Sequence, residues 1–319
     1  MEALSPPRGL IVELVTPFKR DGGIDGRGLG RLLDRVSPYA QGVFLASPRA
    51  GEGKALTPDL RVELLEQAIL SIRRNPVPIF MWVTGESEDK TRETILALKE
   101  AAKRQKHGAD LFWVDTPLYY HSNRGLPHLY EDLCAIGGAP FILHNDPELI
   151  GSLAKSFKRN NIRTAVLKEL TALKGITGLI FSGSLDRAHH YQRACRGRPH
   201  FRIYDGDEAH FLDHPSRSGA VSIGANLAPG AWEKITQSSL HLSSNGKEYP
   251  DRLQQIWESG DSLRSMREIY LKAPVAIIKD ILAEMGIIKT PVSITPAEDI
   301  EESRTRLMEL ITRLGDCRL

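Results

Sequence analysis

The stretch "ADLFWVDTPLYYHSNRGLPHLYEDLCAIGGAPFILHND" (residues 109–146) contains the unit that decides the fold. It begins with a short apolar run that indicates a buried strand, and it passes through a helical pattern over 126–136. A second apolar run follows at 140–146. Parallel strands need a long crossover between them, and a helix usually supplies it. The stretch therefore predicts a strand–helix–strand module of a parallel sheet.

The same alternation extends over most of the chain. Short apolar runs typical of buried strands lie at 9–18, 42–47, 78–85, 109–117, 140–146, 177–183, 201–207 and 219–225, and helical patterns separate them. Eight strands alternating with helices predict an α/β fold of the (β/α)8 TIM barrel class. We expect the barrel over residues 1–240 and a C-terminal helical region over 241–319, with helices at 230–242, 249–259, 262–271, 273–286 and 297–314.

Composition restricts the class of protein. The 319 residues are 41% hydrophobic and 26% charged, with a net charge of +2, an ordinary soluble balance that predicts no nucleic-acid and no membrane partner. Cys134, Cys195 and Cys317 lack the close spacing of a zinc site or a disulfide framework. The N-terminus lacks the basic start and apolar run of a signal peptide. The expected location is the cytoplasm.

Functional side chains of a TIM barrel lie at the carboxyl ends of its strands. In this chain those ends form a polar mouth rich in carboxylates, with Glu13, Arg49, Glu52, Tyr119, His144, Asp146, Asp205, Asp207 and Asn226.

The chain resembles the dihydrodipicolinate synthase and N-acetylneuraminate lyase family of class I aldolases. The matching stretches are "IVELVTPF", "AGEGKALTPDLRVELLEQA", "VDTPLYYHSNRGLPHLYEDL", "ILHNDP", "IYDGDE", "GAVSIGANLAP" and "APVAIIKDILAEMGI", in the family's order over residues 8–315. The resemblance implies a lyase built as a homotetramer or homodimer of barrels. It also implies a lysine Schiff base with a 2-oxo acid such as pyruvate, without a separate cofactor.

Two adjacent hydroxyl residues that hold the pyruvate carboxylate in the family are absent. In "SPRAGEG" (47–53) their positions are Arg49 and Ala50, while the following Gly51 and Glu52 are kept. An arginine can bind a carboxylate through two parallel hydrogen bonds. We expect a rebuilt pocket for a small carboxylate or 2-oxo acid.

His144 stands where the family has its proton-shuttling tyrosine. A histidine can serve as a general acid or base near neutral pH, although a histidine facing a barrel is also often a hydrogen-bonded core residue. Leu149 replaces the family arginine that meets a distal substrate carboxylate, which makes a dicarboxylate or semialdehyde partner less expected.

The position of the family's lysine decides whether this chain can form a Schiff base. Lys168 in "VLKELT" is followed by an acidic residue as in the family, but the apolar residues around it recur at helical spacing and predict an outer helix. Counting back from "DGDE" by one strand and one helix favours Ile180 in "TGLIFSG" as the position of the family lysine, at the cost of an insertion near 153–160. Without that amine no imine forms.

The remaining candidates have structural alternatives. Glu13 interrupts an apolar strand and requires a partner if buried, for which Arg49 is available. Asp207 could simply cap a helix, and Tyr119 could serve as an interface contact. Asp205 and Asn226 are candidate ligand contacts, and no spacing motif supports a metal site.

Three functions stay open. The first is catalysis on a small oxo or hydroxy acid by acid–base residues without an imine. The second is a non-catalytic homologue that binds a ligand or serves as a structural or regulatory partner. The third is an ordinary Schiff-base lyase that uses Lys168.

Overall fold

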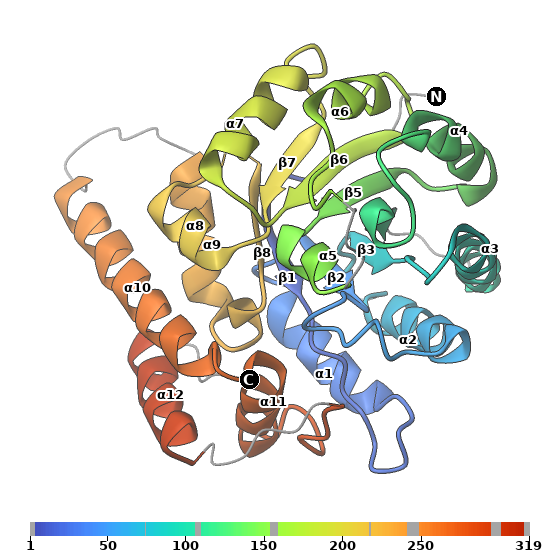
Figure 1. Cartoon of the computed structure of the whole chain (residues 1–319). Coiled ribbons are helices and arrows are strands. Elements are labelled where there is room, and N and C mark those ends of the chain that lie inside the picture. Colours follow the sequence, from blue (N-terminus) through green and yellow to red (C-terminus); the bar gives the residue numbers. More distant parts are fainter. Residues whose placement is uncertain are drawn as a thin grey trace.

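The chain forms a closed barrel of eight parallel strands in sequence order, surrounded by helices (Figure 1). The structure is a computed structural model and describes residues 4–73, 75–105, 110–153, 159–216, 218–240, 249–294 and 301–315. The predicted (β/α)8 TIM barrel is confirmed, because each strand pairs with its neighbours in the sequence and β8 closes onto β1.

All eight predicted strands are present. They are β1 (Gly9–Glu13), β2 (Gly42–Leu45), β3 (Ile79–Trp82), β4 (Leu111–Asp115), β5 (Phe141–Asn145), β6 (Ile176–Phe181), β7 (Arg202–Asp205) and β8 (Gly219–Ser222). Almost every strand residue is buried, because helices cover the outside of the sheet and side chains fill the inside.

Except for α5, which no sequence pattern predicted, the helices around the strands agree with the sequence patterns. They are α1 (Gly26–Val36), α2 (Pro58–Ser71), α3 (Glu88–Arg104), α4 (Leu126–Gly137), α5 (Pro147–Gly151), α6 (Thr164–Leu170), α7 (Leu185–Ala194), α8 (Glu208–Asp213) and α9 (Pro229–Leu240), with short 3-10 turns η1 (Pro117–Tyr119) and η2 (Gly224–Asn226). Side chains of Asp25, Thr57, Ser87 and Ser184 cap the starts of α1, α2, α3 and α7.

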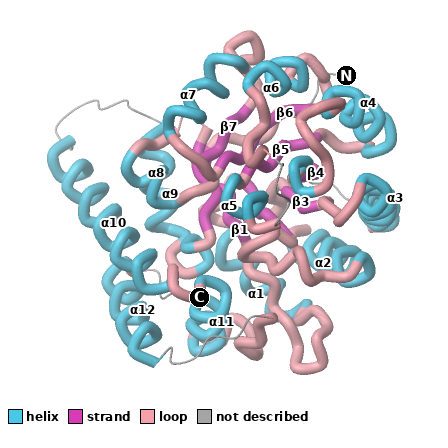
Figure 2. The backbone as a smooth tube through the Cα atoms, viewed as in Figure 1, coloured by secondary structure: helices cyan, strands magenta, loops and turns pink. Residues whose placement is uncertain are grey.

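The C-terminal helices lie on one side of the barrel, beside α8, α9 and α1 (Figures 1 and 2). They are α10 (Tyr249–Tyr270), α11 (Pro274–Glu284) and α12 (Glu301–Leu314). The expectation of two helices at 249–259 and 262–271 is wrong, since α10 continues through Gly260. A glycine inside a helix costs only about 1 kcal/mol, which packing of a long helix offsets. None of the described helices is long and apolar enough to cross a membrane.

Aromatic rings fill the barrel interior. Phe44, Phe80 and Phe112 are register neighbours on β2, β3 and β4, and the ring of Tyr204 packs edge-on against Phe80 from β7. Phe44 also makes an edge contact with His144, with ring centroids 6.3 Å apart. Neighbours in register point to the same face of a sheet. His144 therefore faces the barrel interior above a layer of large apolar side chains.

Candidate active site

The loop after β2 is tightly folded and carries Arg49 into the mouth. Ala46 and Glu52 both have left-handed backbones, with φ of 51° and 52°. A Cβ on Gly51 would lie 2.3 Å from the Ser47 nitrogen, and one on Gly53 would lie 1.8 Å from the Ala46 oxygen. Non-glycine residues rarely adopt positive φ unless the surroundings impose it. The retained Gly51 thus has an architectural role in this loop.

Glu52 also has a structural role in this loop. Its carboxylate accepts hydrogen bonds from the Lys279 ammonium of α11 and from the Ile294 amide, and the Lys279 Nζ lies 4.3 Å from the centre of the Phe18 ring. Lys279 is fully buried. Burial lowers the pKa of Lys279, and the nearby Glu52 carboxylate opposes that effect. The pair ties α11 to the β2 loop instead of facing the mouth.

Arg49 binds two carboxylates of the β5–α5 loop. Its Nε and Nη2 lie 2.7 Å from Asp146 Oδ2, and its Nη2 lies 2.8 Å from Glu148 Oε2. Arg49 was available as an ion-pair partner for Glu13, but its partners in the structure are Asp146 and Glu148. The reason is that the β2 loop turns the guanidinium, which is 50% exposed, towards α5 and away from the interior, where Glu13 lies.

Glu13 faces the barrel interior, because it is the register neighbour of the inward-facing Phe44. Its carboxyl accepts a weak hydrogen bond from the Ala50 amide at 3.5 Å and is bonded by the Ser47 hydroxyl. Burial raises the pKa of Glu13 despite those bonds and the nearby Arg49 charge. Glu13 is thus a carboxyl group disposed to hold its proton.

His144 is the penultimate residue of β5 and is 6% exposed. Its Nδ1 lies 2.8 Å from the Thr116 hydroxyl oxygen, which accepts a hydrogen bond from the Trp82 indole. The Thr116 hydroxyl can therefore donate its own proton to Nδ1. We assign the proton of the neutral ring to Nε2 on this basis. Burial lowers the pKa of His144 to about 4, with the Asp146 carboxylate opposing and the Arg49 charge reinforcing the shift. The imidazole is neutral at physiological pH.

Ile180 and Lys168 lie in different parts of the molecule. Ile180 is on β6, in register between His144 of β5 and Tyr204 of β7, and it is 1% exposed. Lys168 is in the last turn of α6 and is exposed on the outside of the barrel. The residues proposed as an insertion before α6 include 154–158, which lie outside the described residues.

Asp115, at the end of β4, is the centre of a hydrogen-bond network. The fully buried carboxylate accepts hydroxyl bonds from Thr84 at 2.7 Å and from Tyr120 and Tyr130 at 2.8 Å. Burial raises the pKa of Asp115 against those bonds. The spacing of a strand-end aspartate before two tyrosines was the available signal. Tyr119, beside them, packs edge-on against Trp82 and is half-buried.

The other predicted site residues have structural partners. Asp207 caps α8 by accepting from the amides of Ala209 and His210. Asp205 pairs in register with the outward-facing Phe181 and binds His210 Nδ1 at 2.9 Å, so it lies outside the barrel interior. Asn226 lies in η2, which follows β8. Its side chain accepts a hydrogen bond from the Val15 amide and donates one to the Glu13 carbonyl, so it holds η2 against the end of β1.

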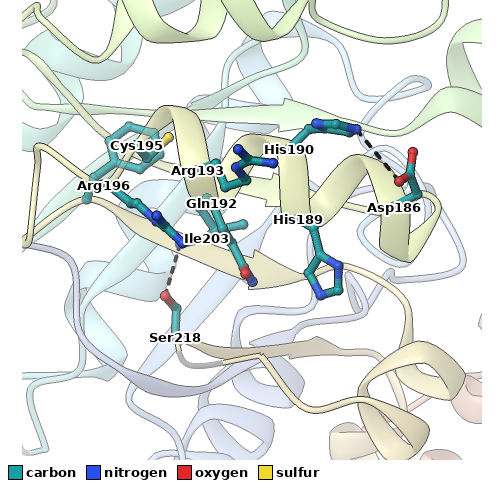
Figure 3. Close-up of a pocket in the computed structure, with 10 residues that line it drawn as sticks. Asp186, His189, His190, Gln192, Arg193, Cys195, Arg196, Ile203 and Ser218 are labelled. Atoms are coloured by element: carbon teal, nitrogen blue, oxygen red, sulfur yellow. Dashed lines mark hydrogen bonds and ion pairs between the residues drawn. The ribbon is translucent and has the colours of Figure 1, made fainter.

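His189 and His190 line a surface groove on α7, outside the barrel (Figure 3). His190 faces Asp186 at 3.7 Å, and Ser218 lies across the groove at the amino end of β8 (Figure 3). Within the described ranges, no three His, Cys, Asp or Glu side chains gather as a metal site would require.

Comparison with known proteins agrees with the barrel and its appended helices. The dihydrodipicolinate synthetase family matches residues 6–314. The chain belongs to this family. The family match covers the barrel strands, the β2 loop and the C-terminal helices together.

Relatives and solved structures carry the family name. A 4-hydroxy-tetrahydrodipicolinate synthase of Alcanivorax borkumensis is 24% identical over 314 residues, covering 97% of this chain and 98% of the relative. One from Xylella fastidiosa is 30% identical over 233 residues, 71% of each chain. A family protein from E. coli K12, solved in complex with pyruvate, aligns with a TM-score of 0.77 and 21% identity, covering 97% of this chain and 99% of that one.

Proposed function

We propose that this family member binds a small 2-oxo or 2-hydroxy acid in the barrel mouth and acts on it without a Schiff base. The observation that carries the proposal is the pair His144 and Ile180, buried side by side on β5 and β6. An imine requires an amine at the reacting centre. The apolar Ile180 offers none, and the exposed Lys168 on α6 lies on the outside of the barrel.

The groups left in the mouth suit proton transfer and carbonyl polarisation. A neutral imidazole with its proton on Nε2 can donate a hydrogen bond to a carbonyl oxygen without carrying charge. Burial raises the pKa of Glu13, so this carboxyl holds its proton more readily than an exposed one and can serve as a proton donor. We assign His144 the role of hydrogen-bond donor and Glu13 the role of acid–base group. Arg49 supplies the charge that a ligand carboxylate needs.

Binding without turnover is the second candidate. The low pKa of His144 favours it, because an imidazole with a pKa of about 4 is a weak base. Both candidates require a ligand in the mouth, and turnover separates them.

The test is a thermal-shift screen of 2-oxo and 2-hydroxy acids against the parent protein and Glu13→Gln, followed by product analysis of every acid that binds. A ligand that binds only the folded state raises the melting temperature with its concentration. We expect stabilisation by at least one acid of this class, with loss of turnover in Glu13→Gln if the protein is an enzyme. Absence of stabilisation by the whole panel would contradict the proposal.

A further inference from the structure

The guanidinium of Arg49 is already occupied by carboxylates of its own chain. Two of its nitrogens bind Asp146 at 2.7 Å, and Nη2 also binds Glu148 at 2.8 Å. A guanidinium binds a carboxylate well through two nitrogens held in a plane. A ligand carboxylate that uses Arg49 must therefore compete with an internal one.

The two internal carboxylates differ in how firmly they are held. The Asp146 side chain is 1% exposed, and its second oxygen caps α5 by accepting from the amides of Glu148 and Leu149. The Glu148 side chain is 83% exposed. An exposed ion pair contributes only about 0–1 kcal/mol, whereas a buried and hydrogen-bonded carboxylate is costly to displace. Glu148 is the replaceable partner.

We propose that Glu148 is an internal substitute for the ligand carboxylate, and that a small 2-oxo or 2-hydroxy acid binds by displacing it from Arg49. Asp146 keeps the guanidinium oriented during the exchange. This inference rests on the proposed function and adds a specificity-determining residue to it. Ligands must carry a carboxylate to displace Glu148, and neutral analogues gain nothing from Arg49.

The exchange site is accessible from solvent and lies near the charged groups of the mouth. Beyond the effect of burial, the Arg49 charge lowers the pKa of the His144 imidazole and the Asp146 carboxylate opposes that effect, so Arg49 lies within electrostatic range of the ring. A carboxylate that replaces Glu148 takes a solvent-accessible position on the guanidinium, since the Glu148 side chain is 83% exposed.

The experiment measures dissociation constants by titration calorimetry for pyruvate and lactate, and for their neutral amides pyruvamide and lactamide. The variants are Glu148→Gln, which keeps the size of the side chain and removes its charge, and Arg49→Gln and Arg49→Lys, which remove the planar partner. Glu93→Gln is the matched control, because Glu93 is also an exposed glutamate in an ion pair, 2.7 Å from Lys90 on α3.

We expect Glu148→Gln to bind both acids about two- to fivefold more tightly than the parent, the range set by an exposed ion pair, with no change for the amides. Glu93→Gln should bind like the parent, and both Arg49 variants should lose affinity for the acids. If the acids bind through Arg49 but Glu148→Gln equals the parent, the inference is overturned and the proposed function stands. If neither the parent nor Glu148→Gln binds any acid, both are overturned.

Discussion

His144 and Ile180 are register neighbours on β5 and β6, with both side chains buried inside the barrel. A titratable imidazole thus lies beside an apolar side chain inside the barrel. The mouth also holds a buried carboxyl, Glu13, and a guanidinium, Arg49, that is bound by internal carboxylates.

The His144 imidazole should make the protein sensitive to acid. Its folded-state pKa of about 4 lies below its ordinary value of 6.5, so its neutral form contributes stability above pH 6.5 that is lost as the pH falls towards 4. We expect His144→Gln to lose less unfolding free energy than the parent over this window, by on the order of 2–3 kcal/mol. Urea unfolding at a series of pH values measures this. The exposed His189→Gln is the control, and equal slopes for the parent and His144→Gln would refute the assignment.

The Asp115 network should stabilise the carboxyl end of β4. Asp115→Ala leaves the hydroxyls of Thr84, Tyr120 and Tyr130 without their acceptor and should cost about 3 kcal/mol or more. Tyr120→Phe removes a single donor and should cost about 1 kcal/mol. Chemical denaturation measures both values. Similar costs for the two variants would show that the network does not act through Asp115.

The Lys279–Glu52 pair should behave as a buried ion pair. Lys279→Met leaves the Glu52 carboxylate buried without its charge partner, and we expect a loss of about 3–5 kcal/mol in unfolding free energy. Adding Glu52→Gln should recover part of that loss, because the glutamine oxygen can still accept from the Ile294 amide. The exposed Lys289→Met is the control. Additive losses in the double variant would contradict the coupling.

The sequence predicted the barrel well because periodicity alone decides it. Each apolar run became a strand, and each helical pattern between runs became a covering helix. The short helix α5 was missed, since five residues carry no period, although Asp146 before Pro147 was a capping signal. The sequence pattern predicts two helices on either side of Gly260, but packing keeps α10 a single helix despite the low helix propensity of glycine.

Contacts in the site were harder to predict than positions. Strand ends identified Glu13, His144 and Arg49 as neighbours, but the partner of Arg49 depends on where the β2 loop turns, and that turn depends on two left-handed residues. Similarly, the sequence could not tell that Asp205 faces outward, because one residue of register decides which face of the sheet a side chain occupies.

The most direct test of the central claim is borohydride trapping with pyruvate and other 2-oxo acids, read by intact mass and peptide mapping. The 4-hydroxy-tetrahydrodipicolinate synthase of Alcanivorax borkumensis, treated in parallel, is the comparison for labelling. We predict no adduct on this protein at any lysine. A stable adduct, above all on Lys168, would contradict the account and restore an imine-forming lyase.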